Sequence, residues 1–261
     1  MRLEIIARKP DGNSRPTPLL FVHGGWHGAW CWENFQSYFA EQGYASYALS
    51  LRGHGTSEGR ERLRWVRASE FVADVAHVVD QLPRSPVLIG HSIGGYLIQK
   101  YLESHSAPGA VLLASWVQSS CKLFYRMARR HPWQTAKAHL TVEPYAYIET
   151  PDLAREYFFS PDIPPEKLNR YFALLQTDSY LAGWDTVLFN LIRPERVHKV
   201  PMLVLGAGND QAVNRDEVEA IASAYNVRAE FFAGMAHDMM LEKDWMKCAE
   251  RIREWLGERD I

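Results

Sequence analysis

Ser92 is the residue of this sequence whose surroundings most clearly indicate chemistry. It lies in Gly90-His91-Ser92-Ile93-Gly94, a run of the form G-x-S-x-G. The apolar run before the motif predicts a buried strand, and the apolar residues three and four apart after it predict a helix. Between strand and helix, such a motif forms a strained turn with the serine hydroxyl at its tip. We predict that Ser92 is a nucleophile; the alternative is a glycine-rich turn with an ordinary surface serine.

A serine hydroxyl is a weak nucleophile at neutral pH, so it needs a base, and the base needs an acid that orients it. His237 lies in a loop after the last expected strand, and Asp210 lies in the loop after the strand before it. The order serine, aspartate, histidine is the one expected when G-x-S-x-G opens such a site. We predict that Ser92 attacks a carbonyl, that His237 takes and returns the proton, and that Asp210 holds the imidazole.

The other histidines and acids are weaker candidates for these roles. His91 adjoins the serine and points elsewhere from a tight turn, whereas His23, His27 and His54 lie in early loops, whose geometry we expect them to maintain. Asp238 is too close in sequence to His237 to face its ring easily. Asp216 fits a charge that opposes a helix dipole, and Asp178 and Asp185 lie between residues 116 and 199.

Attack on a carbonyl produces an oxyanion, which two backbone N–H groups should face. The loss of one such donor costs roughly 3 kcal/mol of transition-state stabilisation. Ile93, the residue after the nucleophile, is expected to supply one donor. The second should come from His23-Gly24-Gly25-Trp26, with Gly25 as the first candidate and Trp26 as the second. The alternative is that this glycine-rich loop is a turn with no role in catalysis.

The elements that must position these residues alternate along the chain. Apolar or alternating runs predict strands at residues 3–7, 19–22, 44–51, 87–90, 110–114, 201–206 and 228–232. Helices are expected between them, among them one capped by Ser69 and one capped by Asn214 with Glu217 three residues on. This alternation implies a parallel sheet covered on both faces, with sites at the carboxyl ends of its strands. We therefore expect Ser92, Asp210 and His237 to converge at one edge.

Residues 116–199 depart from this alternation. Prolines recur there and aromatic side chains are frequent, which favours short helices broken by proline. We predict a helical lid or cap at 116–199, inserted into a core domain formed by residues 1–115 and 200–261. The alternative role for the aromatic residues is to attach the insertion to the core.

Composition excludes several classes of function. The 261 residues carry a formal net charge of -2, which gives no sign of a nucleic-acid surface. The three cysteines, Cys31, Cys121 and Cys248, are far apart, so neither a disulfide framework nor a zinc site is implied, and a reduced cytoplasmic setting fits best. We expect no signal peptide and no stable membrane insertion, because no run approaches the ~20 apolar residues of a membrane span. The sequence leaves the oligomeric state undetermined.

No cofactor is expected either. Gly206-Ala207-Gly208 lacks the third glycine and the acidic partner of a dinucleotide site. The pair His23 and His27 has no third ligand in view, which disfavours a metal site.

Together these motifs resemble those of the α/β-hydrolase superfamily, over nearly the whole chain except the insertion. The matching runs are His23-Gly24-Gly25, Arg52-Gly53-His54-Gly55-Thr56-Ser57, Gly90-His91-Ser92-Ile93-Gly94-Gly95, Asn209-Asp210 and His237. Residues 23–32 are similar to the plant methylesterase and hydroxynitrile-lyase group, whose members share an H-G-A-W-x-W run. The lyases of that group have threonine where Gly24 stands and lysine where Asp238 stands, so both departures favour an esterase.

The expected function is therefore hydrolysis of a carboxylic ester, or of a thioester or other acyl bond, through an acyl-enzyme on Ser92. The expected substrate is a small molecule with an apolar part, because aromatic side chains commonly line such pockets. Other chemistry on the same residues remains open: hydrolysis of a carbon–carbon bond, a lyase reaction or a cofactor-free oxygenation. A non-catalytic ligand receptor built on the same scaffold is the alternative from another class.

Overall fold

A seven-stranded sheet forms the centre of the molecule. The computed structural model describes residues 1–12 and 14–261. The strands are β1 (Glu4–Arg8), β2 (Leu19–Val22), β3 (Ser46–Ser50), β4 (Val87–His91), β5 (Ala110–Leu113), β6 (Met202–Ala207) and β7 (Ala229–Phe232). Their order across the sheet is β1-β3-β2-β4-β5-β6-β7, and all neighbours are parallel except β1 and β3. The expected mostly parallel α/β-hydrolase sheet is confirmed.

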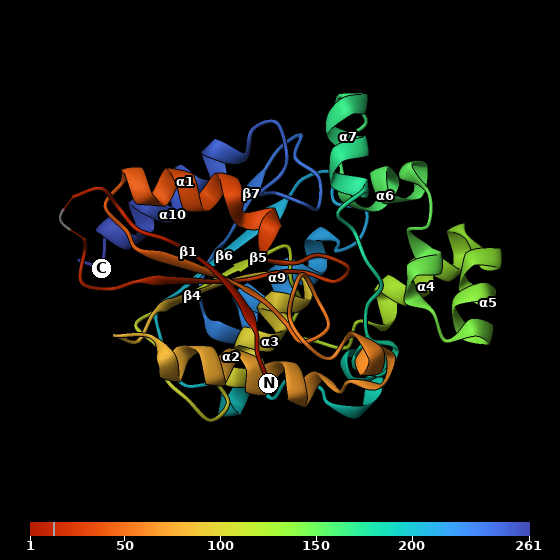
Figure 1. Ribbon diagram of the computed structural model, residues 1–261, viewed down its shortest axis with the longest axis horizontal. Coiled ribbons are helices and arrows are strands. Elements are labelled where there is room, and N and C mark those ends of the chain that lie inside the picture. The colour runs from red at the N-terminus through yellow and green to blue at the C-terminus, as the bar shows by residue number, and fades with distance from the viewer. Residues whose placement is uncertain (13) are drawn as a thin grey trace.

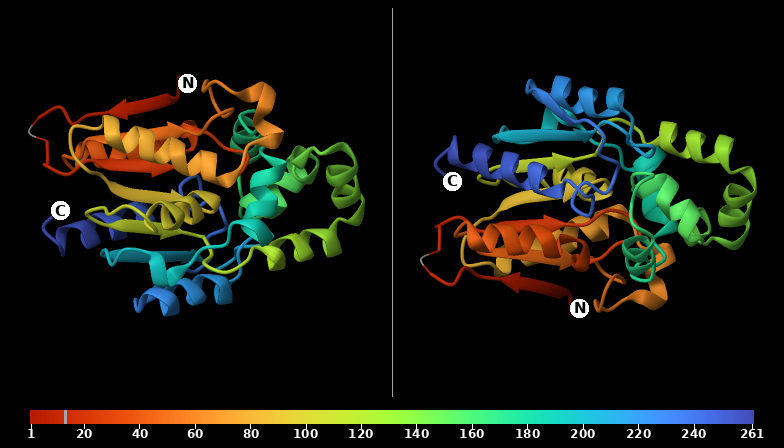
Figure 2. Two further views of the ribbon diagram at one scale, coloured as in Figure 1. Left: turned by 90° about the horizontal axis from the view of Figure 1, so that it is seen from below. Right: turned by 90° about the horizontal axis from the view of Figure 1, so that it is seen from above.

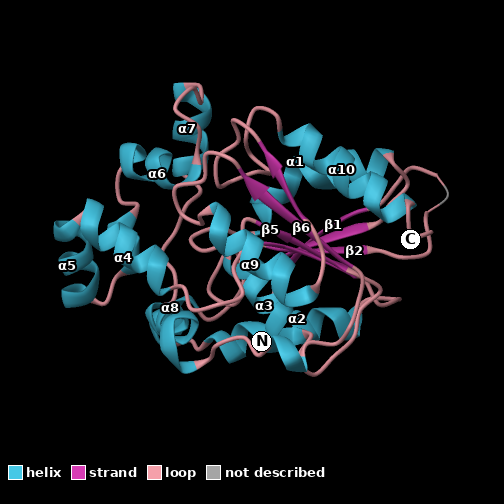
Figure 3. Ribbon diagram, turned by 180° about the vertical axis from the view of Figure 1, so that it is seen from behind, coloured by secondary structure: helices cyan, strands magenta, loops and turns pink. Residues whose placement is uncertain are grey.

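Helices cover both faces of the sheet (Figures 1 and 3). One face carries α1 (Glu33–Glu41) and α10 (Trp245–Gly257), which contact each other, and the opposite face carries α2 (Ala68–Gln81), α3 (Ile93–Tyr101) and α9 (Arg215–Tyr225). The central strands are buried on both faces, so β2, β4 and β5 have continuous apolar sequences rather than alternating ones. The result is one hydrophobic cluster on each side of the sheet.

The chain between β5 and β6 forms a set of short helices. They are α4 (Cys121–Arg130), α5 (Pro132–Thr141), α6 (Pro151–Phe158), α7 (Pro165–Phe172) and α8 (Tyr180–Trp184). Proline opens α5, α6 and α7, where its missing N–H costs nothing because the first turn has no intrahelical acceptor. Figure 2 shows α4 to α7 grouped at one end of the molecule, beyond the sheet.

Short 3₁₀ and π turns complete the structure. They comprise Ala29–Trp32, Arg60–Trp65, Pro144–Tyr147, the π turn Asp185–Phe189 and Pro194–Arg196. No helix among residues 1–12 and 14–261 is long and apolar enough to cross a membrane.

The two expected helix caps have different outcomes. Asn214 caps α9 as predicted, and the Glu217 carboxylate accepts the Asn214 N–H at 2.9 Å. The prediction for Ser69 is wrong, because α2 already begins at Ala68. The Asp185 carboxylate, from the chain between β5 and β6, accepts the Ala68 N–H at 2.8 Å and thereby caps α2 from outside.

The strand order places the candidate site. The strand that follows β2 in sequence, β3, lies on one side of it. The strand that follows β4, β5, lies on the opposite side, so the direction in which successive strands are added reverses between β2 and β4. Crevices form at the carboxyl ends of strands beside such a reversal. The loop with Gly24 and Gly25 follows β2, and Ser92 follows β4, so both lie at this crevice.

Candidate active site

Ser92 occupies a sharp turn between β4 and α3. Its φ of 53° lies in the left-handed region, which is strained for a residue other than glycine. Neighbouring groups hold the turn: the Ser92 N–H donates to the Leu113 carbonyl at 2.9 Å, and the Ser115 hydroxyl donates to the Ser92 carbonyl at 2.8 Å. Gly94 is required because a Cβ there would lie 2.3 Å from the Val22 carbonyl oxygen.

Asp210 and His237 form a buried pair after β6 and β7. His237 Nδ1 lies 2.8 Å from Asp210 Oδ2, and the Ala212 and Val213 N–H groups donate to the other carboxylate oxygen. Burial alone would lower the pKa of the His237 ring, but the charge and hydrogen bond of Asp210 outweigh it and raise that pKa. The pair therefore has the geometry in which a carboxylate fixes the imidazole tautomer.

His91, the residue before Ser92, contacts the histidine of this pair. His91 Nε2 donates to the His237 carbonyl at 2.9 Å, and the centres of the two rings are 4.6 Å apart. Among residues 1–12 and 14–261, the Ser92 hydroxyl makes no hydrogen bond of standard geometry. Catalytic hydrogen bonds often tighten only when substrate is bound.

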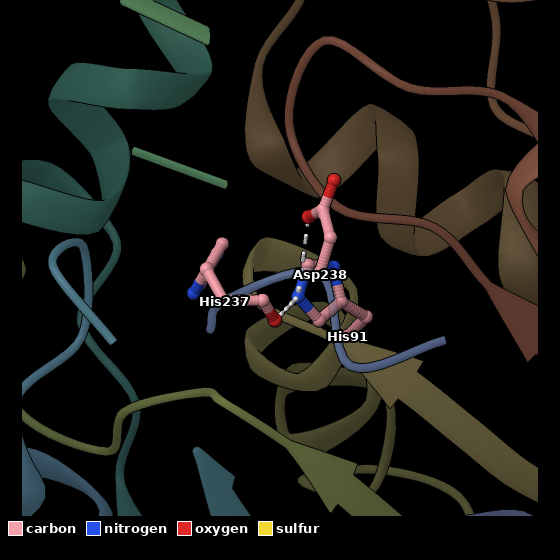
Figure 4. Close-up of side chains that lie close together, drawn as sticks. All are labelled: His91, His237 and Asp238. Carbon is pink, nitrogen blue, oxygen red and sulfur yellow. Dashed lines mark hydrogen bonds and ion pairs between the residues drawn. The ribbon is translucent and has the colours of Figure 1, made fainter. Parts of the chain in front are cut away.

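His91, His237 and Asp238 gather closely enough to be tested as metal ligands (Figure 4). Their ligand atoms lie within 4.8 Å of one another. However, the carbonyl of His237 holds the Nε2 proton of His91, and Asp210 occupies Nδ1 of His237. Burial and the nearby His237 ring lower the pKa of His91 to about 3, so this ring is neutral. The hydrogen bonds indicate that the cluster orients the histidine loop.

A buried ion pair, His27 with Asp238, connects the two loops of the site. His27 Nε2 lies 2.9 Å from Asp238 Oδ2, and His27 Nδ1 lies 2.6 Å from the Gly25 carbonyl. The two ring nitrogens of His27 therefore face acceptors from two different loops. Burial raises the pKa of Asp238, but His27, His91 and His237 together outweigh burial, and the net shift of this pKa is downward. The contact fits the expected role of His27 in maintaining loop geometry, whereas the sequence predicts no partner for Asp238.

The loop after β2 presents a backbone donor, the Gly25 N–H, close to the turn at Ser92. Gly24 packs against the nucleophile turn, since a Cβ there would lie 2.6 Å from His91 Nδ1 and 3.2 Å from Ser92 Cβ. Within the described part of the chain, the Gly25 N–H has no hydrogen-bond acceptor. Ile93 is the first residue of α3, so its N–H has no acceptor within the helix. Both candidate donors, Gly25 and Ile93, are therefore available.

Trp26, the second candidate donor in this loop, is not available. Its N–H donates to Asp178 Oδ2 at 2.9 Å. Its φ of 64° also places the residue in the left-handed region, and its carbonyl accepts the Gln176 N–H at 3.0 Å. The expectation that Trp26 faces the oxyanion is thus corrected: residues 176 and 178 occupy both of its backbone groups.

Asp178, a weaker candidate because it lies between residues 116 and 199, lines the cavity beside Ser92 and contacts the loop after β2. It comes from the chain between β5 and β6, yet its carboxylate is buried against the loop after β2. The Ser179 N–H donates to Oδ1, and His54 Nε2 lies 3.5 Å from the same oxygen. Burial raises the pKa of Asp178, and His54 lowers it to a net downward shift. No periodic signal in the sequence marks this position.

A cavity of about 230 Å³ opens beside Ser92. The core contributes Gly25, Trp26, Ser92 and Ile93 to its wall, and the chain between β5 and β6 contributes the rest. Those residues are Trp116, Ser120, Cys121, Leu123, Phe124, His139, Pro144, Tyr147, Asp178, Ser179, Tyr180, Gly183, Trp184, Thr186 and Val187. The wall is mainly apolar and aromatic, and neither lysine nor arginine lines it in the part of the chain that is described.

Comparison with known proteins identifies the family of this chain. A model of the alpha/beta hydrolase family matches residues 19–251. The pFDCC methylesterase MES16 of Arabidopsis thaliana is 25% identical over 212 residues, which are 77% of this chain and 79% of that protein. Methylesterase 10 of the same plant is 26% identical over 141 residues, which are 44% of this chain and half of that relative's length (50%).

Solved structures share the fold over the full chain. A putative non-heme bromoperoxidase from Mycobacterium tuberculosis superposes with a TM-score of 0.78 at 17% identity, covering 99% of this chain and 97% of its own. A thermophilic esterase from Thermogutta terrifontis gives a TM-score of 0.77 at 17% identity, covering 98% and 93%. The family match spans all strands except β1. This chain belongs to the alpha/beta hydrolase family.

Proposed function

We propose that this chain hydrolyses carboxylic esters of small molecules with an apolar part, through an acyl-enzyme on Ser92. The observation that carries the proposal is the buried Asp210–His237 pair, which is connected through His91 to a strained serine at the wall of an apolar cavity. The relatives named methylesterases support ester hydrolysis as the class of reaction. No cofactor is required for this chemistry.

The proposed reaction has two halves, formation of an acyl-serine and its hydrolysis. Ser92 Oγ attacks the ester carbonyl while His237 Nε2 takes its proton, and Asp210 stabilises the imidazolium that forms. His237 then protonates the leaving alcohol, which departs and leaves an acyl-serine. A water molecule, activated by the same imidazole, attacks the acyl-serine and releases the carboxylic acid. The N–H groups of Gly25 and Ile93 are the proposed donors to the oxyanion in both halves.

The helical chain at residues 116–199 is proposed to act as a lid on a core of residues 1–115 and 200–261. In support, most of the cavity wall comes from this chain, whereas the proposed nucleophile and oxyanion donors come from the core. Exclusion of water by such a cover strengthens the electrostatic interactions inside the site.

The position of Gly24 favours an esterase over the lyase chemistry left open above. The resembling lyases carry threonine there, and a side chain at this position would meet His91 Nδ1 at 2.6 Å. Asp238, which stands where those lyases have lysine, is engaged with His27.

Hydrolysis of p-nitrophenyl acetate and butyrate tests the proposal. The parent protein should release p-nitrophenol, whereas Ser92→Ala should not, and His237→Gln should lower kcat by several orders of magnitude. Ser104→Ala, the same substitution at an exposed serine, serves as the matched control and should match the parent. A fluorophosphonate should label Ser92 in the parent. Equal turnover by the parent and Ser92→Ala, or label found only elsewhere, refutes the proposal.

A further inference from the structure

The Asp178 carboxylate lines the cavity and retains an acceptor position that no described residue uses. It receives the Trp26 N–H on Oδ2 and the Ser179 N–H on Oδ1, with His54 Nε2 at 3.5 Å from Oδ1. Each carboxylate oxygen can accept two hydrogen bonds. Oδ2 therefore has one acceptor position left, and Asp178 lines the cavity.

This free position lies next to the proposed oxyanion donor. Asp178 Oδ2 is 3.1 Å from the point at which a Cβ of Gly25 would stand. A substrate carbonyl held by the Gly25 N–H would have its oxygen about 2.9 Å from that nitrogen. A bare carboxylate so near would repel the negative charge that develops on the oxygen. A hydrogen-bond donor on the substrate, placed between the two, would turn this repulsion into a binding contact.

The rest of the cavity offers little to polar substrates. Aromatic and apolar side chains dominate the wall, with no lysine or arginine among the described residues that line it. When a ligand covers a buried acceptor without donating a hydrogen bond to it, the acceptor loses water and gains no partner, which weakens binding. The cavity thus favours an apolar acyl group with one donor near the carbonyl, and it disfavours an anionic acyl group.

We propose that Asp178 selects esters that carry a hydroxyl or ammonium group on the carbon next to the scissile carbonyl. This inference rests on the proposed ester hydrolysis and names its substrate class. A donor on that carbon is separated from the carbonyl oxygen by only two further atoms, so it reaches Oδ2 while the carbonyl faces Gly25 and Ile93. Sites built to hydrogen-bond a substrate group discriminate strongly against analogues that lack it.

Three methyl esters that share a phenyl group test the proposal: phenylacetate, mandelate with its hydroxyl, and phenylglycine with its ammonium. Each enantiomer is measured, and the readout is the ratio of kcat/KM for the donor-bearing ester to kcat/KM for phenylacetate. The parent should prefer at least one donor-bearing ester by about tenfold or more. Mandelate and phenylglycine distinguish a neutral donor from a cationic one.

Asp178→Asn is the decisive variant, because it removes the charge while keeping the size of the side chain. If Asp178 only supports the loop, all three esters slow together and the ratio stays constant. If it selects the donor, the ratio falls well below that of the parent, because a neutral amide oxygen is a weaker acceptor than a carboxylate oxygen. Asp152→Asn, an exposed acid on α6, is the matched control and should keep the parent ratio. A parent ratio near one, or the same ratio in Asp178→Asn, overturns the proposal.

A binding measurement separates this inference from the proposed reaction. Trp26, Trp116 and Trp184 line the cavity, so ligand binding to the Ser92→Ala protein can be followed by tryptophan fluorescence. A lower Kd for mandelate than for phenylacetate supports the selection by Asp178 even if the parent hydrolyses neither ester. Equal Kd values for all three esters contradict it, whatever the catalytic result.

Discussion

The ion pair of His27 and Asp238 yields the sharpest prediction about stability. Both side chains are almost completely buried, with exposed fractions of 1% and 0%. Substitution of Asp238 by Asn keeps the shape of the side chain but removes the charge that His27 faces. Breaking a buried pair by removing one partner costs about 3–5 kcal/mol. We therefore expect D238N to lose about that much free energy of unfolding.

The measurement is urea unfolding at neutral pH, followed by tryptophan fluorescence, for the parent, D238N, H27Q and the double variant. The two side chains touch, so their effects should not add. The double variant leaves no unpaired charge and should be more stable than the sum of the single effects by about 1–3 kcal/mol. The same variants should also lower kcat/KM, because His27 holds the Gly25 carbonyl on the proposed oxyanion loop.

Glu219→Gln provides the matched control, since Glu219 forms an exposed pair with Arg215 on the surface of α9. Exposed pairs contribute about 0–1 kcal/mol, so this variant should unfold close to the parent. The reasoning is refuted if D238N changes stability no more than this control does. It is also refuted if the effects of D238N and H27Q add within about 0.5 kcal/mol.

Two further predictions concern His237, the proposed base, and the turn at Ser92, the proposed nucleophile. The pKa of His237 is raised above 6.5, the ordinary value for histidine, and the proposed base must be unprotonated to act. We therefore expect kcat/KM to rise with pH through a midpoint above 6.5. A pH–rate profile in which this midpoint lies below 6.5 would contradict the prediction. Gly94→Ala should cost at least about 2 kcal/mol in urea unfolding, because its Cβ would overlap the Val22 carbonyl. Gly257→Ala, which meets nothing within 4 Å, is its control, and equal stability of the two variants would show that the turn can relax.

Much of the fold was predictable because its signals are local. The buried strands β2, β4 and β5 have short apolar runs in sequence, and such runs reflect burial on both faces of a sheet. The turn at Ser92 was equally predictable from the sequence, because glycines are required where two backbone segments approach closely. The pairing of Asp210 with His237 followed from their places after adjacent strands.

The incorrect predictions concern hydrogen bonds between residues that lie far apart in the sequence. Ser69 has the residue type of a cap, but the cap of α2 is Asp185, which lies 117 residues from Ala68. Trp26 follows two glycines in the expected loop, but its N–H is taken by Asp178, 152 residues away. Sequence patterns describe what a residue can donate or accept, and they do not show which distant group will compete for it.

The sequence by itself determined the order of strands and helices, the sharp turn at Ser92 and the identities of the acid and base candidates. Periodicity and glycine placement encode these features within a few residues. Only the tertiary structure decided that Asp178 lies against the loop after β2 and that His27 pairs with Asp238, its partner 211 residues away. These contacts depend on how loops without any repeating pattern pack at one edge of the sheet, where burial forces each polar group to find a partner.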